Sequence, residues 1–407
     1  MGKSHPPKPS KYFLPVHPSA IILIMTVDAT PLIWVDSPKA LQDLAEDLST
    51  YAQVAVDTES NSLYAYQEQV CLIQFSTPSA DYLVDPLRLR DLSALGPLFA
   101  SERIEKIFHA AEYDLICLKR DFGFTFRNIF DTMHAARILG RSEVGLANLL
   151  KQEFGLQLEK HYQRADWSQR PLPPAMLEYA RHDTHFLIPL RQRLATALQQ
   201  KGLWELARED FARLTEVSPP NTDLSRGPDW NLAQRYNLTP QQMAVLAALY
   251  AYRDEQARQA NLPHFKILSN EVLLELARTL PQNPRDLSRL GLLNAKQRAR
   301  FQEGLLETIR AALTAPPPPR PRNGIPDEAV LARLEHLRQW RKQLGRHLGV
   351  ESDIILPRDL MERIARENPT RLEDLAQIMQ STPWRFRRFG TEILRVLQEA
   401  NFALAHP

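Results

Sequence analysis

The chain has 407 residues, which is more than one ordinary hydrophobic core holds and indicates two or three domains. Hydrophobic residues make up 44% and charged residues 24% of it, a balance typical of soluble globular proteins, and no apolar run approaches the roughly 18 residues of a membrane span. We therefore expect no membrane segment and no membrane partner. The formal net charge of +2 neither favours nor excludes a nucleic-acid partner.

Two cysteines, Cys71 and Cys117, lie in apolar runs. A zinc site needs more Cys or His ligands at close spacing, so we expect both to be buried free thiols. Few cysteines, and no small-residue cleavage site after the first apolar stretch, indicate a cytoplasmic protein.

The composition changes several times along the chain. We expect residues 1–30 to be a disordered extension and residues 31–218, which mix strand-like and helical patterns, to form an α/β domain. Residues 219–315 and 325–407 are almost purely helical in pattern, and the proline-rich residues 316–324 between them are typical of an extended spacer. The sequence thus predicts an α/β domain followed by two all-α domains.

Within the α/β region, short strands come first, and strands then alternate with helices. Strands are expected at 53–57, 70–76, 81–84 and 106–109, and helices at 37–51, 92–99, 112–122, 133–139, 145–154 and 174–200. Short connections make the first three strands an antiparallel meander. This order predicts a mixed sheet with helices on its faces.

The two helical regions repeat one another at a single offset of 88 residues. At this offset Tyr252-Arg253 matches Trp340-Arg341, Ile267-Leu268 matches Ile355-Leu356, Leu276-Ala277 matches Ile364-Ala365, Pro281 matches Pro369, and Asp286-Leu287 matches Asp374-Leu375. One ungapped offset over this span predicts two copies of one small helical domain, whose cores contain the matching apolar positions.

Asp57 and Glu59 end the strand-like run that begins at Val54. Because side chains alternate along a strand, both carboxylates project to one face. They repel each other unless a cation lies between them, and hard divalent cations bind such oxygen ligands. Taken alone, the pattern also fits an exposed turn.

Later in the chain, three more residues, Asp114, Tyr179 and Asp183, are candidates for the same site. Asp114 falls in the first turn of a predicted helix, where the helix dipole by itself favours an acid. Tyr179 and Asp183 are four residues apart and share one face of a long apolar helix. An acid in an apolar stripe is costly unless it is paired or binds metal, whereas a Tyr there is usually part of the core.

Together, Asp57, Glu59, Asp114 and Asp183 carry a formal charge of −4, which two divalent ions, Mg²⁺ or Mn²⁺, would balance. Two such ions can clamp the attacking and leaving oxygens of a phosphodiester. A phenol with a pKa of about 10 is a poor base at pH 7. We therefore expect Tyr179 to orient the attacking water rather than to take its proton.

These motifs, in this order, resemble those of the DEDDy group of 3′→5′ exonucleases. The similarity to the bacterial ribonuclease D family extends to the runs 70–74, 131–132 and 166–172, and the repeated units resemble HRDC domains (helicase and RNase D, C-terminal). The resemblance covers nearly everything after residue 30. It implies a ribonuclease H-like fold, a two-metal mechanism, release of nucleoside 5′-monophosphates, and 3′-end trimming of structured RNA such as tRNA precursors. We expect a monomer.

Basic and aromatic residues alternate between residues 160 and 170, a mixture that suits a single strand because cations meet phosphates and rings stack on bases. Six residues are candidate substrate contacts: Gln74, His109, Lys160, Arg164, Trp167 and Arg170. The alternatives are a solvated loop, and structural hydrogen bonding for Gln74 and His109. A second such run, residues 384–389, predicts either an RNA grip or an amphipathic helix with core aromatics.

The acids do not distinguish RNA from single-stranded DNA, because both phosphodiesters are hydrolysed by nearly the same chemistry. A single-stranded DNA exonuclease therefore stays open as a second hypothesis. A non-catalytic nucleic-acid-binding scaffold is a third, against which the complete set of acids argues.

Overall fold

The computed structural model describes residues 30–158, 161–219, 236–315 and 327–405. The predicted extension before residue 30 and the predicted spacer at 316–324 lie outside the described residues. The predicted domain boundaries fall beside undescribed segments and stay predictions. Within the described residues, no helix is long and apolar enough to cross a membrane.

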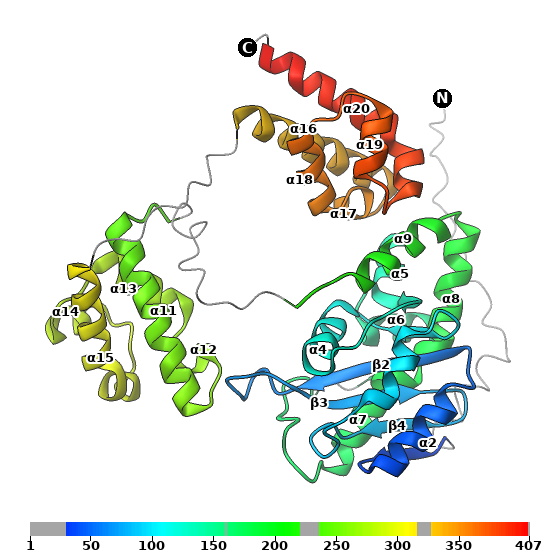
Figure 1. Ribbon diagram of the computed structural model, residues 1–407, viewed down its shortest axis with the longest axis horizontal. Helices are drawn as coiled ribbons and strands as arrows, with labels where there is room; N and C mark the ends of the chain where they lie inside the picture. Colours follow the sequence, from blue (N-terminus) through cyan, green and yellow to red (C-terminus); the bar gives the residue numbers. More distant parts are fainter. Residues whose placement is uncertain (1–29, 159–160, 220–235, 316–326, 406–407) are drawn as a thin grey trace, which may run out of the picture.

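A six-stranded mixed sheet forms the centre of the α/β domain (Figure 1). Its strands are β1 (Leu32–Val35), β2 (Gln53–Ser60), β3 (Val70–Ser76), β4 (Asp81–Val84), β5 (Glu105–Phe108) and β6 (Ile129–Asp131), in the order β1-β4-β3-β2-β5-β6. β2 and β4 pair antiparallel with β3, and the remaining pairs are parallel. The predicted mixed sheet with an antiparallel meander is therefore confirmed.

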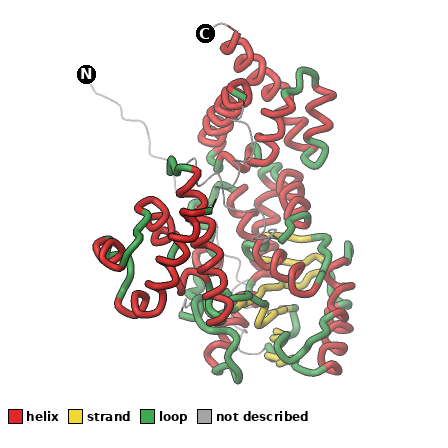
Figure 2. The backbone as a smooth tube through the Cα atoms, turned by 60° about the vertical axis from the view of Figure 1, so that its left-hand side comes forward, coloured by secondary structure: helices red, strands yellow, loops and turns green. Residues whose placement is uncertain are grey.

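Helices cover both faces of the sheet (Figure 2). The helices α2 (Pro38–Leu48), α3 (Gly96–Ala100) and α4 (Glu112–Phe122), with the short 3-10 helix η2 (Ser93–Leu95), share a core with β2 and β3 on one face. The other face is covered by α5 (Thr132–Ile138), α6 (Leu146–Phe154), α7 (Pro174–His185), α8 (Leu187–Gln200) and α9 (Trp204–Thr215). The inner strands are thus buried between two helical layers, whereas the edge strand β1 is partly exposed.

Three local features differ from the prediction. β1 and β6 were not predicted, because three or four residues are too few to show a period. The predicted helix over 174–200 is two helices that meet at Phe186. Pro189 explains the break: it has no N–H to bond to the preceding turn, and it is tolerated because it falls in the first turn of α8.

The two helical units have the same architecture. The first contains α11 (Pro240–Ala260), α12 (His264–Ile267), α13 (Asn270–Thr279), α14 (Pro284–Arg289) and α15 (Ala295–Thr314), and the second contains α16 (Glu328–Leu348), α17 (Ser352–Ile355), α18 (Arg358–Glu367), α19 (Leu372–Ile378) and α20 (Pro383–Ala405). Corresponding helices begin at positions 88 residues apart, and each unit has its own apolar core. The predicted duplication is confirmed.

The second unit packs on α5 and α9 of the α/β domain. Arg385 is fully buried there, and its guanidinium bonds to Glu209 and Asp210, at 3.1 and 2.9 Å, and to the carbonyl oxygen of Ile354. Of the two alternatives for residues 384–389, the structure favours the amphipathic helix: Phe389 is in the core, and Arg387 is exposed.

The first unit contacts the loop between β2 and β3. The Tyr66 hydroxyl donates to Asp254 Oδ1 at 2.9 Å, and the same oxygen lies 2.7 Å from His264 Nε2. Lys266 Nζ lies 4.3 Å from the ring centroid of Tyr64. Figure 1 shows α12 on the side of the first unit that faces this loop.

Candidate active site and metal centre

Three of the four predicted acids, Asp57, Glu59 and Asp183, line one cavity of about 340 Å³. Its walls come from the end of β2, the loop before α4, the start of α6, the two residues Leu158 and Gln163, and α7. It is lined by Asp57, Thr58, Glu59, His109, Gly145, Leu146, Ala147, Leu158, Gln163, Tyr179 and Asp183. Segments more than 100 residues apart in the chain therefore supply a single site.

Asp57, Glu59 and Asp183 form the centre of this cavity. Each offers one carboxylate oxygen, and the three oxygens lie within 4.8 Å of one another. The alternation of β2 places Asp57 and Glu59 on one face, as predicted. α7 packs over that face and brings Asp183 to them.

Asp114 reaches the same cluster from the first turn of α4. It is 6% exposed, and its Oδ1 accepts a hydrogen bond of 2.5 Å from the hydroxyl of Thr58. Thr58 lies between the two acids of β2 and points to the opposite face of the strand. Thr58 thus holds Asp114 by a hydrogen bond, while Asp57 and Glu59 on either side of it belong to the cluster with Asp183.

The electrostatics of these acids are those of crowded, desolvated carboxylates. Burial raises the pKa of Asp57 well above its ordinary value, and the charges of Asp114, Asp183 and Glu59 raise it further. Burial also raises the pKa of Glu59, with Asp183 and Asp114 adding to it. The pKa of Asp114 and that of Asp183 rise to about 7, in both cases mainly because the groups are buried. Ionising all four acids without a counter-charge is therefore unfavourable.

A divalent cation fits these residues. The donors are hard carboxylate oxygens, three of them are close enough to share an ion, and among the residues that the structure describes no Lys or Arg side chain lines the cavity. A bound cation would supply the missing positive charge and keep the carboxylates ionised. Of the four predicted metal ligands, the structure brings Asp57, Glu59 and Asp183 together, and Asp114 lies close enough for its charge to raise the pKa of Asp57.

Asp131 holds the loop that leads to Asp114. It is fully buried at the end of β6, and its oxygens accept the backbone N–H groups of Ala110 and Ala111 at 3.2 and 2.7 Å and that of His134 at 2.9 Å. Ala110 has φ +63°, a left-handed conformation that is unfavourable for a residue with a side chain. These bonds stabilise the turn from which α4 starts.

Tyr179 lines the cavity one turn before Asp183. Its ring packs against Trp167 and Tyr162, at centroid distances of 6.0 and 5.8 Å. Burial and the charges of Asp183 and Glu59 raise the pKa of its hydroxyl far above the ordinary value. The phenol therefore stays protonated at neutral pH, which agrees with the expected orienting role.

Three of the six predicted substrate contacts are buried or held in contacts within the protein. Gln74 is 0% exposed opposite Asp57, and Trp167 is 1% exposed behind the ring of Tyr179. Arg170 forms two bonds of 2.8 Å with Asp85 and donates to the carbonyl of Cys71. The burial of Gln74 and Trp167 and the ion pair of Arg170 with Asp85 favour structural roles for these three residues, and their contact with a substrate stays a prediction.

The other three candidates differ from one another. His109 lines the cavity, and its Nδ1 lies 2.8 Å from the hydroxyl of Thr132. Arg164 is exposed. Lys160 lies outside the described residues. The sequence singled out neither Thr58 nor Gln163 as a site residue; each stands next to a predicted one, and that adjacency was the available signal.

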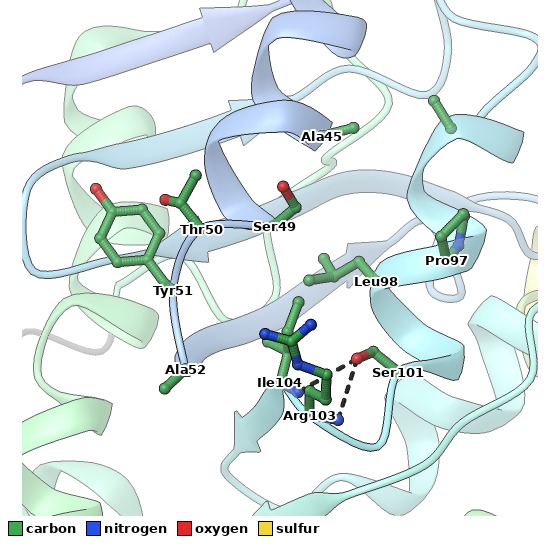
Figure 3. Close-up of a pocket in the computed structure, with 11 residues that line it drawn as sticks. Ala45, Ser49, Thr50, Tyr51, Ala52, Pro97, Leu98, Ser101, Arg103 and Ile104 are labelled. Carbon is green, nitrogen blue, oxygen red and sulfur yellow. Dashed lines mark hydrogen bonds between the residues drawn. The ribbon is translucent and has the colours of Figure 1, made fainter.

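A second cavity, of about 410 Å³, lies between the end of α2, α3 and the start of β5 (Figure 3). Arg103 is the one charged residue in its wall, and the Ser101 hydroxyl accepts the backbone N–H of Arg103. Its described lining residues include no acid, His or Cys, whereas the cavity lined by Asp57, Glu59 and Asp183 offers the carboxylate oxygens that divalent cations prefer.

Comparison with known families divides the chain as the fold does. The 3′-5′ exonuclease family matches residues 32–199, which contain all four acids and Tyr179. The HRDC domain family matches residues 242–309 and 330–397, one match in each helical unit.

Curated relatives share the catalytic part of the chain. "Exosome complex component 10" of Rattus norvegicus is 35% identical over 275 residues, which are 65% of this chain and 31% of that protein. "Exosome complex exonuclease RRP6" of Saccharomyces cerevisiae is 35% identical over 269 residues, covering 62% of this chain and 37% of that protein. The chain spans about a third of the length of these relatives.

Solved structures show the same fold. The catalytic core of RRP6 from Trypanosoma brucei has a TM-score of 0.61 at 29% identity, covering 73% of this chain and 85% of that one. Escherichia coli RNase D has a TM-score of 0.66 at 24% identity, covering 90% of this chain and 98% of that one. The likeness to RNase D includes both helical units, because it extends over nearly the whole of both chains.

Proposed function

We propose that this chain, which contains a 3′-5′ exonuclease domain followed by two HRDC domains, is a ribonuclease D-like enzyme that hydrolyses RNA from the 3′ end and releases nucleoside 5′-monophosphates. The observation that carries the proposal is the meeting of Asp57, Glu59 and Asp183 oxygens within 4.8 Å, beside Asp114 and Tyr179.

We propose that these four carboxylates hold two divalent ions, Mg²⁺ or Mn²⁺. When bound, such ions acidify a water and stabilise the charge on the leaving 3′-oxygen. The negatively charged carboxylate oxygens would select hard cations, and the hydrogen bond from Thr58 holds the carboxylate of Asp114 in position.

Tyr179 acts on the attacking water. Its phenol stays protonated, so it can donate or accept a hydrogen bond but does not remove a proton at neutral pH. The buried Trp167 behind it and Asp183 one turn away fix the position of the hydroxyl. Tyr179 orients the attacking water through its O–H dipole, which is already in position and does not have to rotate during the reaction.

The proposed substrate is RNA with a single-stranded 3′ end, with tRNA precursors as the first candidate and the monomer as the working form. RNA rather than DNA is supported by the relatives, which are named as exosome components, and by the likeness to RNase D, whose structure is described as that of an exoribonuclease involved in structured RNA processing. The buried free thiols of Cys71 and Cys117 support a cytoplasmic location.

The test is a nucleotide-release assay with the full chain and a 5′-labelled RNA. Mg²⁺ or Mn²⁺ should give a ladder shortened from the 3′ end, and chelation should stop it. Asp57→Asn should lower the rate about 1000-fold, which corresponds to the several kcal/mol that a metal site supplies. Asp43→Asn, at an exposed acid of α2, is the matched control and should leave the rate as it is.

Two outcomes would decide against the proposal. Unimpaired cleavage by the Asp57→Asn variant would reject the assigned site. Faster trimming of a DNA oligomer than of an RNA of the same sequence would reject RNA in favour of the single-stranded DNA hypothesis.

A further inference from the structure

The same short helix of each HRDC domain faces the exonuclease domain. α12 of the first domain and α17 of the second are equivalent, and begin at His264 and Ser352, 88 residues apart. α12 contacts the β2–β3 loop, and α17 contacts α5 and α9. The duplication therefore allows a position-by-position comparison of the two contacts.

In the second domain, the side chains of this helix are engaged in the contact with the exonuclease domain. Asp353 accepts a hydrogen bond of 2.6 Å from Arg137, and Ile354 is 3% exposed within the core on α5 and α9. The carbonyl oxygen of Ile354 also accepts bonds from the buried Arg385. Both side chains are thus covered or paired.

In the first domain, the equivalent positions hold Phe265 and Lys266, and both are exposed. Phe265 is 54% exposed, a large value for an aromatic residue. Lys266 has no acidic partner among the described residues, and its Nζ lies above the ring of Tyr64. The first domain therefore exposes an aromatic ring and a cation at the two positions through which the second domain attaches to the exonuclease domain.

This open helix is connected to the active-site cavity by direct contacts. The hydroxyl of Tyr64 donates to the carbonyl oxygen of Arg164 at 2.6 Å. Gln163, the preceding residue, lines the cavity of the acids, and the ring of Tyr162 packs edge-on against Tyr179. The rim of the catalytic cavity thus continues through Arg164 and Tyr64 to Lys266.

We propose that Tyr64, Arg164, Phe265 and Lys266, here called the tail-binding surface, bind the single-stranded RNA upstream of the nucleotide that is being removed. The proposal rests on the proposed function, since it deepens the substrate path of that same site. Lys266 and Arg164 would contact phosphates, and Phe265 would stack on a base.

The chemistry of the surface fits a single strand better than a duplex or a protein. Every base has a face that can stack on an exposed ring, so such a surface grips RNA without reading its sequence. The nearby acid Asp254 of α11 is held by hydrogen bonds with Tyr66 and His264 and does not pair with Lys266. Glu68, the acid of the β2–β3 loop, is bonded to Tyr113 and paired with Arg120.

The experiment compares substrates of two lengths on the full chain. An RNA of about 4 nucleotides fills little more than the cavity, whereas one of about 16 nucleotides also reaches the tail-binding surface. The readout is the length preference, defined as kcat/KM for the long RNA divided by kcat/KM for the short one. Binding of the long RNA is measured separately by fluorescence anisotropy in an Asp183→Asn background, in which it is not degraded.

Phe265→Ala should lower the length preference and weaken binding of the long RNA about 10-fold, and Phe265→Trp should restore both, because stacking needs a ring and not this particular one. Lys266→Ala should weaken binding and lower the slope of log affinity against log salt by about one unit. Phe402→Ala, at a phenylalanine of α20 that is 66% exposed, should keep the parent's length preference.

A length preference within about twofold of the parent in both Phe265→Ala and Lys266→Glu would overturn the proposal. Unchanged melting temperatures would show that both variants are folded. Failure of the proposed function would look different, because the unmodified chain would then release no nucleotides from the short RNA either.

Discussion

Arg385 of α20 and Asp210 of α9 form an ion pair of 2.8 Å between the second HRDC domain and the exonuclease domain, and the arginine side chain is 0% exposed. A buried guanidinium must have all its donors satisfied, and here Glu209 and the Ile354 carbonyl complete the set. The second HRDC domain is thus joined to α9 through a buried guanidinium whose partners come from both domains.

Arg385→Ala should detach the second HRDC domain. Removing the arginine leaves Glu209 and Asp210 without their buried partner, and we expect a loss of about 3–5 kcal/mol in the free energy of unfolding of the docked state. Arg387→Ala, at an exposed arginine of the same helix, should cost less than about 0.5 kcal/mol. Chemical denaturation measures both. Equal stabilities of the two variants would contradict the prediction.

Tyr179→Phe should lower kcat about 100-fold and leave KM within about twofold, because the hydroxyl acts on the water and does not bind the substrate. The variant keeps the ring, so its packing against Trp167 and Tyr162 is preserved. Steady-state kinetics on a short RNA measures both constants. A raised KM with an unchanged kcat would mean that Tyr179 binds RNA instead.

Thr58→Val should weaken metal binding about 10–100-fold, as expected when a metal-ligating side chain loses the group that orients it. The change removes the hydrogen bond to Asp114 and keeps the shape of the side chain. Calorimetric titration with Mn²⁺ reports the affinity. Asp131→Asn should have an effect of the same order, because it loosens the Ala110-Ala111 turn. Parent-like affinity in both variants would show that neither residue positions Asp114.

Mg²⁺ should stabilise the protein more at pH 8 than at pH 5.5. In the metal-free protein, the pKa of Asp114 and that of Asp183 rise from 3.8 to about 7, so the folded chain holds these protons longer than the unfolded chain. Stability of the metal-free protein therefore falls as pH rises from about 4 to about 7, and a bound cation removes that loss.

Melting curves in EDTA and in saturating Mg²⁺ test this linkage. Hydrogen bonds from His185 and Ser76 lower the pKa of Asp81, which makes the protein more stable as pH rises, both with and without metal. The quantity to compare is therefore the difference in melting temperature between Mg²⁺ and EDTA at each pH. Asp183→Asn should flatten the difference. A pH-independent difference in the parent would refute the linkage.

The four acids and Tyr179 could be predicted from the sequence because their chemistry is local in pattern. Asp57 and Glu59 follow an apolar strand, and Tyr179 and Asp183 are one helical turn apart. The repeat was equally visible, since one offset fixes all five helices of the second HRDC domain. Periodicity and spacing are enough where the side chains of one element share a face.

Contacts between distant segments could not be predicted in this way. Trp167 and Arg170 are of the residue types found in RNA-binding loops. Only the fold shows that Trp167 packs against the ring of Tyr179 and that Arg170 pairs with Asp85. The same holds for Asp131, whose bonds to Ala110 and Ala111 join residues about 20 positions apart. Hydrogen bonds of this kind follow from tertiary packing, for which a single sequence gives no period.

The equivalence of α12 and α17 also gives this protein an internal reference for mutational experiments. A substitution at Ile354 changes both the stability of its own domain and its attachment, whereas the same substitution at Lys266 changes a residue that lies on the surface. The two positions occupy the same place in one architecture, yet Lys266 carries a different side chain and itself contacts Tyr64 of the exonuclease domain. The pair therefore compares a buried attachment of an HRDC domain with an exposed one, without cutting the chain.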